Sequence, residues 1–339
     1  MKDRFIKRSF DLGTASTAVL VAFCVQLVFQ MIVLLLGLSD RAETWTIVVG
    51  NQVVLFGVSI FFCFYHKVDP FAVTGVKRPP KWYFFPLFIL IALCCLAAFA
   101  PLSGIISKLL TKLGYEFMPE YYVPMDRPGL FVLAFLGLTV LPAIGEETAV
   151  RGVLLSGGKE KSPLFAILFS ALIFALMHGN LRQLVHQFLL GAVMGYLAYL
   201  TGGIYASATV HFVNNGMALL LDYGRAHGWV DKQVYWYIGG KLGAEPTIVG
   251  MSVALFALVM LLVLVTCLLH RERAAKEEYI PSNGKLSARI TAYLTYLSTP
   301  EQERTEKHPL TRYSVVMAIV LAAVLLSVLL LTLIPGVGA

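Results

Sequence analysis

Residues 128–157 read PGLFVLAFLGLTVLPAIGEETAVRGVLLSG. This run is long enough to cross a bilayer, since about 20 predominantly apolar residues suffice for a transmembrane helix. It differs from an ordinary span because its second half carries Glu146, Glu147 and Arg151. Ionisable groups at membrane depth cost roughly 2.5–3.5 kcal/mol each on insertion scales, so they are candidates for function. The stretch predicts a membrane helix that brings charged groups into the bilayer.

The composition of the whole chain supports a membrane protein. Hydrophobic residues make up 58% and charged residues 14% of the 339 residues, whereas a soluble domain has about 45–50% apolar and about 25% charged residues. A soluble enzyme, a disordered chain and a disulfide scaffold are therefore excluded. The apolar runs are unbroken and Leu-rich, which disfavours the alternating strands of a β-barrel. The five cysteines all lie inside apolar runs, as buried hydrophobes do.

The apolar runs predict an all-α, polytopic helical membrane protein with about nine transmembrane helices. The expected spans are residues 14–38, 45–65, 83–106, 128–157, 163–178, 183–200, 203–222, 247–269 and 313–335. We divide the chain into three parts. Residues 1–127 hold the first three spans, residues 128–222 form a core of four spans, and residues 223–339 form a C-terminal extension.

The positive charges predict how the chain is oriented. Most of the 27 Lys and Arg residues fall on the N-terminal segment and on loops that alternate spans place on the same side. The positive-inside rule then puts the N-terminus in the cytoplasm and the C-terminus outside, in a multi-pass protein of the cell membrane. The net charge of +7 is explained by this topology and by anionic lipid headgroups, so no nucleic-acid partner is needed.

The loop before the last span carries apolar residues at helical spacing. They are Leu286, Ile290, Tyr293, Leu294 and Leu297. This pattern fits an amphipathic helix in the membrane interface, and equally a helix packed on the protein's own loops.

Polar groups of the kind used in catalysis are confined to the four core spans. They are Glu146, Glu147, Arg151, His178, His186, His211, Asn214 and Asn215. At about 1.5 Å rise per residue, most of them lie within a turn or two of one depth. We therefore expect one polar cavity inside the bilayer, with His186 near the outer surface in a structural role.

Spacing along the helices separates the roles of neighbouring residues. Glu147 and Arg151 are four residues apart, so they share a helix face and can pair. His211 and Asn215 have the same spacing and point the same way. Glu146 is rotated about 100° from Glu147, so the two carboxylates need not act together.

This set is sufficient for amide hydrolysis without a serine or cysteine nucleophile. Glu146 could take a proton from water that His178 positions, and His211 and Asn215 could donate hydrogen bonds to an oxyanion. Zinc is the alternative cofactor, held by Glu146, His178 and His211. Spacing alone does not separate the two cases.

Three motifs give the core a family resemblance. E-E-x-x-x-R-G occurs at residues 146–152, F-x-x-x-H at residues 174–178 and H-x-x-x-N at residues 211–215, in order and each on its own span. With these motifs the chain resembles the bacterial branch of the intramembrane CAAX-protease and bacteriocin-processing (CPBP, or Abi) family. Val150 departs from the pattern, because the family often has an aromatic residue there.

The resemblance implies an intramembrane endopeptidase that hydrolyses a peptide bond of a membrane-associated protein or peptide. It also implies that the first glutamate activates water, that two histidines and the asparagine complete the site, and that the site faces the cytoplasm. Both metal-dependent and metal-free routes have been associated with the family. The alternative is a non-catalytic bacteriocin-immunity or membrane scaffold protein with the same fold. A proton-coupled transporter is disfavoured, because no internal repeat is visible.

Overall fold

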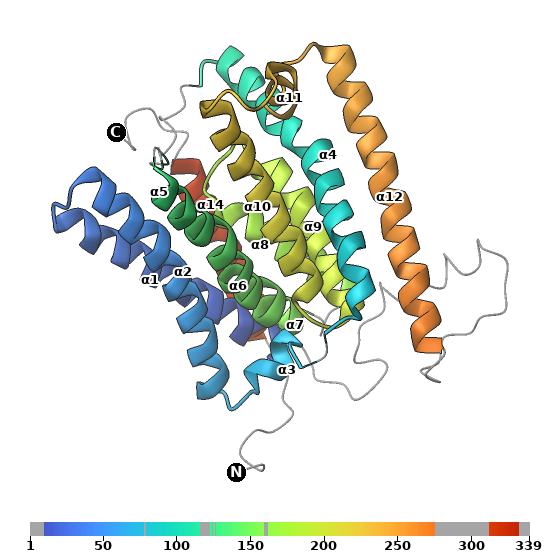
Figure 1. Cartoon of the computed structure of the whole chain (residues 1–339). Helices are drawn as coiled ribbons and strands as arrows, with labels where there is room; N and C mark the ends of the chain where they lie inside the picture. The colour runs from blue at the N-terminus through green and yellow to red at the C-terminus, as the bar shows by residue number, and fades with distance from the viewer. Residues whose placement is uncertain are drawn as a thin grey trace.

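The computed structural model describes residues 10–77, 79–115, 123, 125, 127–158, 162–274 and 312–331. Every regular element among these residues is a helix, which confirms the predicted all-α class (Figure 1). Two segments, η3 and η4, are π-helical. The elements are α1 (Leu12–Leu35), α2 (Asp40–Tyr65), α3 (Pro70–Thr74), η2 (Trp82–Phe84), α4 (Phe85–Lys112), α5 (Pro128–Phe135), η3 (Leu136–Val140), α6 (Leu141–Glu147), η4 (Thr148–Leu154), α7 (Leu155–Gly158), α8 (Pro163–Met177), α9 (Leu184–Thr201), α10 (Tyr205–Ala226), α11 (Lys232–Ile238), α12 (Ala244–Ala274) and α14 (Arg312–Leu331).

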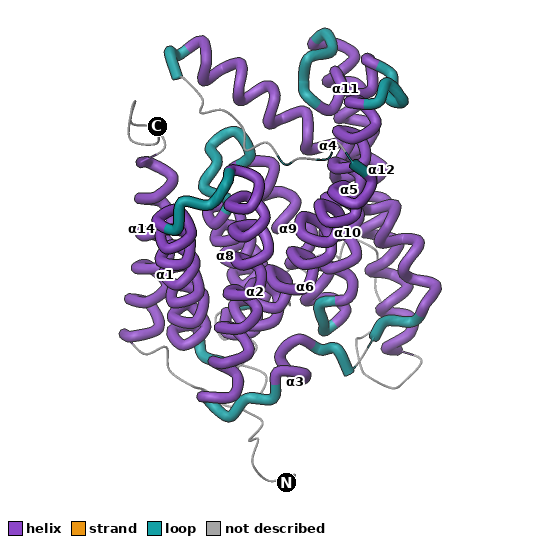
Figure 2. Tube along the Cα trace, turned by 60° about the vertical axis from the view of Figure 1, so that its left-hand side comes forward, coloured by secondary structure: helices purple, strands orange, loops and turns teal. Residues whose placement is uncertain are grey.

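The long helices run side by side as a bundle, with α3 at one end and α11 at the other (Figure 2). In Figure 1 the hairpin of α1 and α2 forms one side and α12 the other, with α4, α8, α9 and α10 between them. Helix α4 packs against α9, α10 and α12. Its fully buried side chains include Phe88 and Ile91, which pack in one cluster with Phe84 of η2 and with residues of the core spans. The motif-bearing helices are therefore the packed interior of the molecule.

The predicted number of nine spans is not confirmed. Six helices in the described part of the chain are long and apolar enough to cross a membrane. They are residues 12–35, 40–65, 82–112, 128–158, 184–201 and 244–269. Helix α10 has 22 residues but is more polar, and the side chains of α14 are described only in part. The predicted amphipathic segment at residues 286–297 lies outside the described residues.

Helix α8 is shorter than its neighbours α9 and α10 and shorter than the continuous helical run of residues 128–158. The Ser162 hydroxyl accepts a hydrogen bond from the Phe165 amide at 3.0 Å, and Pro163 occupies the first turn, so both signals fix where the helix begins. It ends after 15 residues, with His178 as its C-cap. This length corresponds to about 22 Å, less than the roughly 30 Å of a bilayer core. The helix therefore delivers His178 to an interior level instead of to the opposite surface.

The turn between α2 and α4 is tied to the turn between α9 and α10. The Ile204 amide donates to the Thr74 carbonyl at 2.9 Å, and the Tyr205 hydroxyl donates to the Val76 carbonyl at 3.0 Å. Lys81, at the start of α4, pairs with Glu272 near the end of α12 at 2.9 Å. Segments at three predicted cytoplasmic turns thus meet at one end of the bundle. The side of the membrane that this end faces stays a prediction.

Helices α8 and α9 approach each other closely at Gly191. A Cβ atom on Gly191 would lie 3.1 Å from the Ala171 Cα atom and 3.2 Å from the Phe174 Cδ1 atom. Small residues at such positions let helix backbones meet in the membrane. This contact agrees with the close packing that the spacing of Gly191 and Gly195 predicts.

We predict that Gly191→Leu destabilises the protein through this contact. The added side chain has no space against α8, and overpacking of this kind costs about 1–3 kcal/mol. Gly57→Leu is the matched control, because a Cβ at this helical glycine meets nothing within 4 Å. Thermal unfolding in detergent should show a lower midpoint for Gly191→Leu only. Equal midpoints for the two variants would contradict the prediction.

Candidate active site

Two π-helical segments flank the pair of adjacent glutamates. Glu146 and Glu147 end α6, and the π segments η3 and η4 lie immediately on either side of α6. A π segment adds a residue to a helical turn and so changes which side chains face a neighbour, and such segments are frequent at functional sites. Proline disfavours a regular helix interior, and Pro142 lies just after η3.

Asn215 satisfies a carbonyl group that Pro142 leaves without its usual donor. Proline has no N–H, so the carbonyl four residues earlier, on Leu138, loses its helical hydrogen bond. The Asn215 Nδ2 atom donates to this Leu138 oxygen at 3.1 Å. An unpaired backbone group in the bilayer costs several kcal/mol. One N–H of the Asn215 amide therefore has a structural partner on the helix that carries the glutamates.

Glu147 and Arg151 form a completely buried ion pair. The Arg151 Nη1 atom donates to Glu147 Oε1 at 2.8 Å, and both side chains have 0% exposure. Arg151 Nη2 also donates to the Gly191 carbonyl at 3.1 Å. The pairing predicted from the four-residue spacing is confirmed. Because both charges are compensated inside the protein, Glu147 is unsuited to bind a mobile proton or a substrate.

The Glu147 carboxylate also sets the orientation of His211. The His211 Nδ1 atom lies 3.0 Å from Glu147 Oε1, and the imidazole is 2% exposed. A carboxylate paired with arginine only accepts hydrogen bonds, so Nδ1 must carry the proton. In neutral His211 the second nitrogen, Nε2, is then an acceptor. Donation from Nε2 to an oxyanion, as we expected from the sequence, requires a second proton on this ring.

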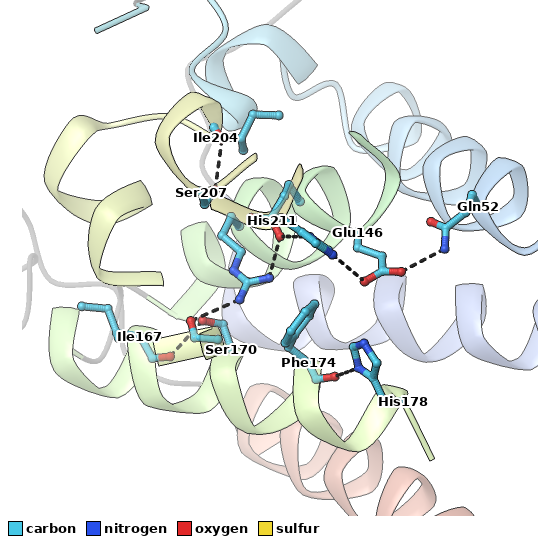
Figure 3. A network of polar contacts seen from close by, with 12 residues as sticks. Gln52, Glu146, Ile167, Ser170, Phe174, His178, Ile204, Ser207 and His211 are labelled. Atoms are coloured by element: carbon cyan, nitrogen blue, oxygen red, sulfur yellow. Dashed lines mark hydrogen bonds and ion pairs between the residues drawn. The ribbon is translucent and has the colours of Figure 1, made fainter. Parts of the chain in front are cut away.

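Glu146 has a different environment from Glu147. Its side chain is 15% exposed, and its Oε2 atom lies 3.9 Å from His211 Nε2. Its other oxygen, Oε1, accepts a hydrogen bond from the Gln52 Nε2 atom of α2 at 2.9 Å. Figure 3 shows Glu146 between Gln52 and His211, with Phe174 and His178 beside them. Glu146 is thus the carboxylate that keeps one oxygen directed at an imidazole nitrogen and open to a small molecule.

His178 completes this side of the site. Its Nδ1 atom lies 2.8 Å from the Phe174 carbonyl oxygen, which can only accept, so Nδ1 donates. Nε2 of neutral His178 is then an acceptor, as in His211. Helix α8 brings His178 to the site because it ends there.

The Phe174 ring contacts three charged or polar residues of the site. The Arg151 Cζ atom lies 4.3 Å from the ring centroid, and the rings of His178 and His211 meet it edge to face at 4.8 Å and 5.6 Å. A guanidinium over an aromatic face is attracted by the ring quadrupole. From the sequence we expected core packing at Phe174, with a role in shaping the site second. In the structure Phe174 does both: it is 1% exposed within the core, and its ring contacts the residues of the site.

The remaining residues that the sequence singled out lie at the margin of the site. His186 Nδ1 is 3.4 Å from the Ser103 hydroxyl of α4, and Asn214 is buried beside His211 on α10. Gln52 was missed as a site residue, because we expected it to join helices as Gln26 and Gln30 do. The latter two donate to Asn51. The sequence does contain a signal for this contact. Gln52 directly follows Asn51, so its side chain faces a different side of α2 from the one that meets α1.

The described side chains do not fit the zinc set that the sequence left open. No three His, Cys, Asp or Glu side chains among the described residues are grouped so that they could hold a metal ion. Each histidine uses its Nδ1 atom for a protein partner, Glu147 or the Phe174 carbonyl, and this leaves Nε2 to the site. What the geometry offers is two imidazole acceptors and one carboxylate oxygen.

Comparison with known proteins agrees with the resemblance seen in the motifs. Residues 128–217 match the family model described as Rce1-like, type II CAAX prenyl endopeptidase Rce1-like. Over these residues the core is similar to this family, and we refer to them as the Rce1-like core. The matched segment runs from α5 into α10 and contains all three motifs, so the Rce1-like core and the candidate site coincide. No curated protein and no solved structure matches the chain.

The Rce1-like family supports a membrane endopeptidase that acts on a peptide or protein. The match gives no support for the bacteriocin (Abi) link or for a metalloprotease. It also leaves α1, α2, α4 and α12, which pack around the core, outside the matched residues.

We predict that breaking the buried ion pair destabilises the fold strongly. Arg151→Met leaves Glu147 charged and uncompensated, at a cost of about 3–5 kcal/mol. Adding Glu147→Gln should recover part of this loss. Lys77→Met is the control, because Lys77 pairs with Asp69 on an exposed surface and such pairs contribute about 0–1 kcal/mol. Unfolding in detergent measures all three variants against wild type, and a double variant less stable than Arg151→Met would contradict the account.

A second prediction concerns the carbonyl of Leu138. Asn215→Leu removes its donor, which should cost about 1–3 kcal/mol. Pro142→Ala supplies a backbone N–H to the same carbonyl, so it should reduce the loss caused by Asn215→Leu. A double-mutant cycle on unfolding free energies measures this coupling. Strictly additive effects would show that the two residues do not serve one carbonyl.

Proposed function

We propose that the protein is an intramembrane endopeptidase in which Glu146 activates water for hydrolysis of a peptide bond. The observation that carries the proposal is the unequal environment of two adjacent carboxylates. Glu147 is neutralised by Arg151 at 2.8 Å. Glu146 keeps an oxygen 3.9 Å from the His211 Nε2 atom and has 15% exposure. A general base needs such a free oxygen within reach of water.

The proton movements balance with Glu146 alone. Water gives one proton to Glu146 while its oxygen attacks the carbonyl carbon of the scissile bond. The tetrahedral intermediate then collapses, the C–N bond breaks, and the proton on Glu146 passes to the leaving amine. One product ends in a carboxylic acid, which then gives its proton to the released amine or to solvent, the other carries the amine, and Glu146 is again ionised.

The two histidines orient the attacking water in this mechanism. Glu147 and the Phe174 carbonyl hold their Nδ1 protons, so both Nε2 atoms present lone pairs to the site. A water that donates one hydrogen to Glu146 can donate the other to an imidazole nitrogen, which fixes its attacking lone pair. Positioning of this kind supplies a large share of the rate enhancement in many enzymes.

The oxyanion is assigned to Asn215. One N–H of the Asn215 amide bonds Leu138, and the second can donate to a substrate oxygen as the oxyanion forms. His211 stays neutral in this mechanism, so its Nε2 atom serves the water.

The substrate class follows from the place of the site. The helices that carry it are packed inside a bundle with several membrane-spanning helices, so the scissile bond must belong to a peptide or protein held in the membrane. The family description names CAAX prenyl endopeptidases, and a prenylated C-terminal segment is accordingly the first candidate.

We predict that Glu146→Gln lowers proteolysis by about 10²–10⁴-fold, the usual contribution of a general base. Membranes from cells producing wild type or variant are compared by mass spectrometry for new peptide termini in membrane proteins. The best cleavage site is then assayed with purified protein in liposomes. Glu245→Gln is the control, since Glu245 lies exposed in the first turn of α12.

The result that contradicts the proposal is equally definite. If a stably folded Glu146→Gln variant yields the same termini as wild type, no peptide bond is hydrolysed by Glu146. If neither protein yields any terminus absent from cells lacking the chain, the non-catalytic alternative replaces proteolysis.

A further inference from the structure

Among the described residues, Gln52 forms a hydrogen bond with Glu146 from outside the Rce1-like core. It lies on α2, whereas the matched residues begin at residue 128. Its Nε2 atom donates to Glu146 Oε1 at 2.9 Å across 94 residues of sequence. By contrast, the amides of Gln26 and Gln30 on α1 donate hydrogen bonds to Asn51 of α2, so they join these two helices to each other.

The approach of α2 to this point depends on the residue before Glu146. A Cβ atom on Gly145 would lie 3.0 Å from the Gln52 Oε1 atom and 3.1 Å from the Gln52 backbone oxygen. Helix α2 therefore packs on α6 where a glycine gives it room. Gly145 thus leaves space for the Gln52 amide next to the Glu146 carboxylate, which the proposed mechanism uses.

The hydrogen bond decides which oxygen of Glu146 faces the site. Rotation about the last side-chain bond of a glutamate is soft, so a free carboxylate would sample many orientations. With Oε1 held by Gln52, Oε2 is directed at His211 Nε2, 3.9 Å away. The amide thereby turns one defined lone pair toward the place of the water.

The Gln52 amide can hydrogen-bond to Glu146 in both its ionised and its protonated form. The NH₂ of Gln52 donates to the carboxylate, and its Oε1 can accept from a carboxylic acid after the amide turns over. This Oε1 atom is buried and has no hydrogen-bond partner within the described part of the chain. The acceptor is thus present and uncommitted.

We propose that Gln52 is a positioning residue that holds Glu146 in its active orientation, an inference that rests on the proposed function. Gln52 does not touch the reacting atoms. It acts through Glu146, and it makes a helix outside the Rce1-like core part of the working site.

A carbodiimide probe tests the contact without a substrate. Dicyclohexylcarbodiimide modifies carboxyl groups in membranes, and mass spectrometry of the peptide containing Glu146 gives the rate. Gln52→Met keeps the length of the side chain but removes the donor, so Oε1 is released to react. We expect modification to rise about fivefold or more, because hydrogen bonds to charged groups are stronger than those between neutral groups.

Asn51→Leu is the matched control. Asn51 lies on α2 beside Gln52, and its replacement removes the hydrogen bond that Gln30 of α1 donates. The rate at which Glu146 is modified in this variant should therefore stay within about twofold of wild type. If Gln52→Met fails to fold, Gln52→Leu serves instead, since it also lacks the donor and adds no carboxyl group. Unchanged modification in the folded Gln52 variant overturns the inference, and so does an equal rise in Asn51→Leu.

The kinetic readout separates this inference from the proposed function. At the cleavage site found for wild type, Gln52→Met should lower kcat about tenfold with KM within about threefold, because the contact is to a group that acts in the transition state. If Glu146→Gln cleaves normally, the proposed function fails and the carbodiimide rates alone judge the Gln52 contact. If Glu146→Gln is inactive but Gln52→Met matches Asn51→Leu in both readouts, only the role of Gln52 fails.

Discussion

The buried pair of Glu147 and Arg151 is the interaction on which the geometry of the site depends. Two charges with 0% exposure are held 2.8 Å apart in the interior of a membrane protein, where an uncompensated charge is strongly unfavourable. The pair links η4 to α9 through the Gly191 carbonyl and to α10 through His211. Since Glu147 orients His211, the neighbouring Glu146 meets a defined imidazole nitrogen.

The backbone around this pair is also specialised. Two π segments and Pro142 interrupt the helix that carries both glutamates. The interruption leaves the Leu138 carbonyl free for Asn215, so a residue expected only in catalysis also holds the helix. Helix α8 contributes through its length, because it ends at the level of the site and places His178 there. Irregular backbone at membrane depth is tolerated here because protein surrounds it.

Local spacing predicted the parts of the site that lie on one helix, and tertiary contacts supplied the rest. The four-residue spacing predicted the pair of Glu147 and Arg151, and the angle between Glu146 and Glu147 predicted that they differ. Composition predicted the all-α membrane fold. The contact of Gln52 with Glu146 could not be predicted, because it depends on how α2 packs against Gly145. The proton position on His211 likewise depends on Glu147, which is distant in sequence, whereas that on His178 is set by the Phe174 carbonyl one turn earlier on the same helix. The prediction of nine spans counted α8 because it is apolar and did not take its short length into account.

The central claim is that Glu146 and the two imidazoles share one water in a site organised by the buried ion pair. A high-resolution structure of the protein in lipid nanodiscs tests this most directly. The account predicts a single water within hydrogen-bond distance of Glu146 Oε2 and of at least one histidine Nε2 atom, with Gln52 on the other carboxylate oxygen. A metal ion with Glu146, His178 and His211 as ligands at about 2.1 Å would contradict it, and so would a Glu146 side chain turned toward lipid.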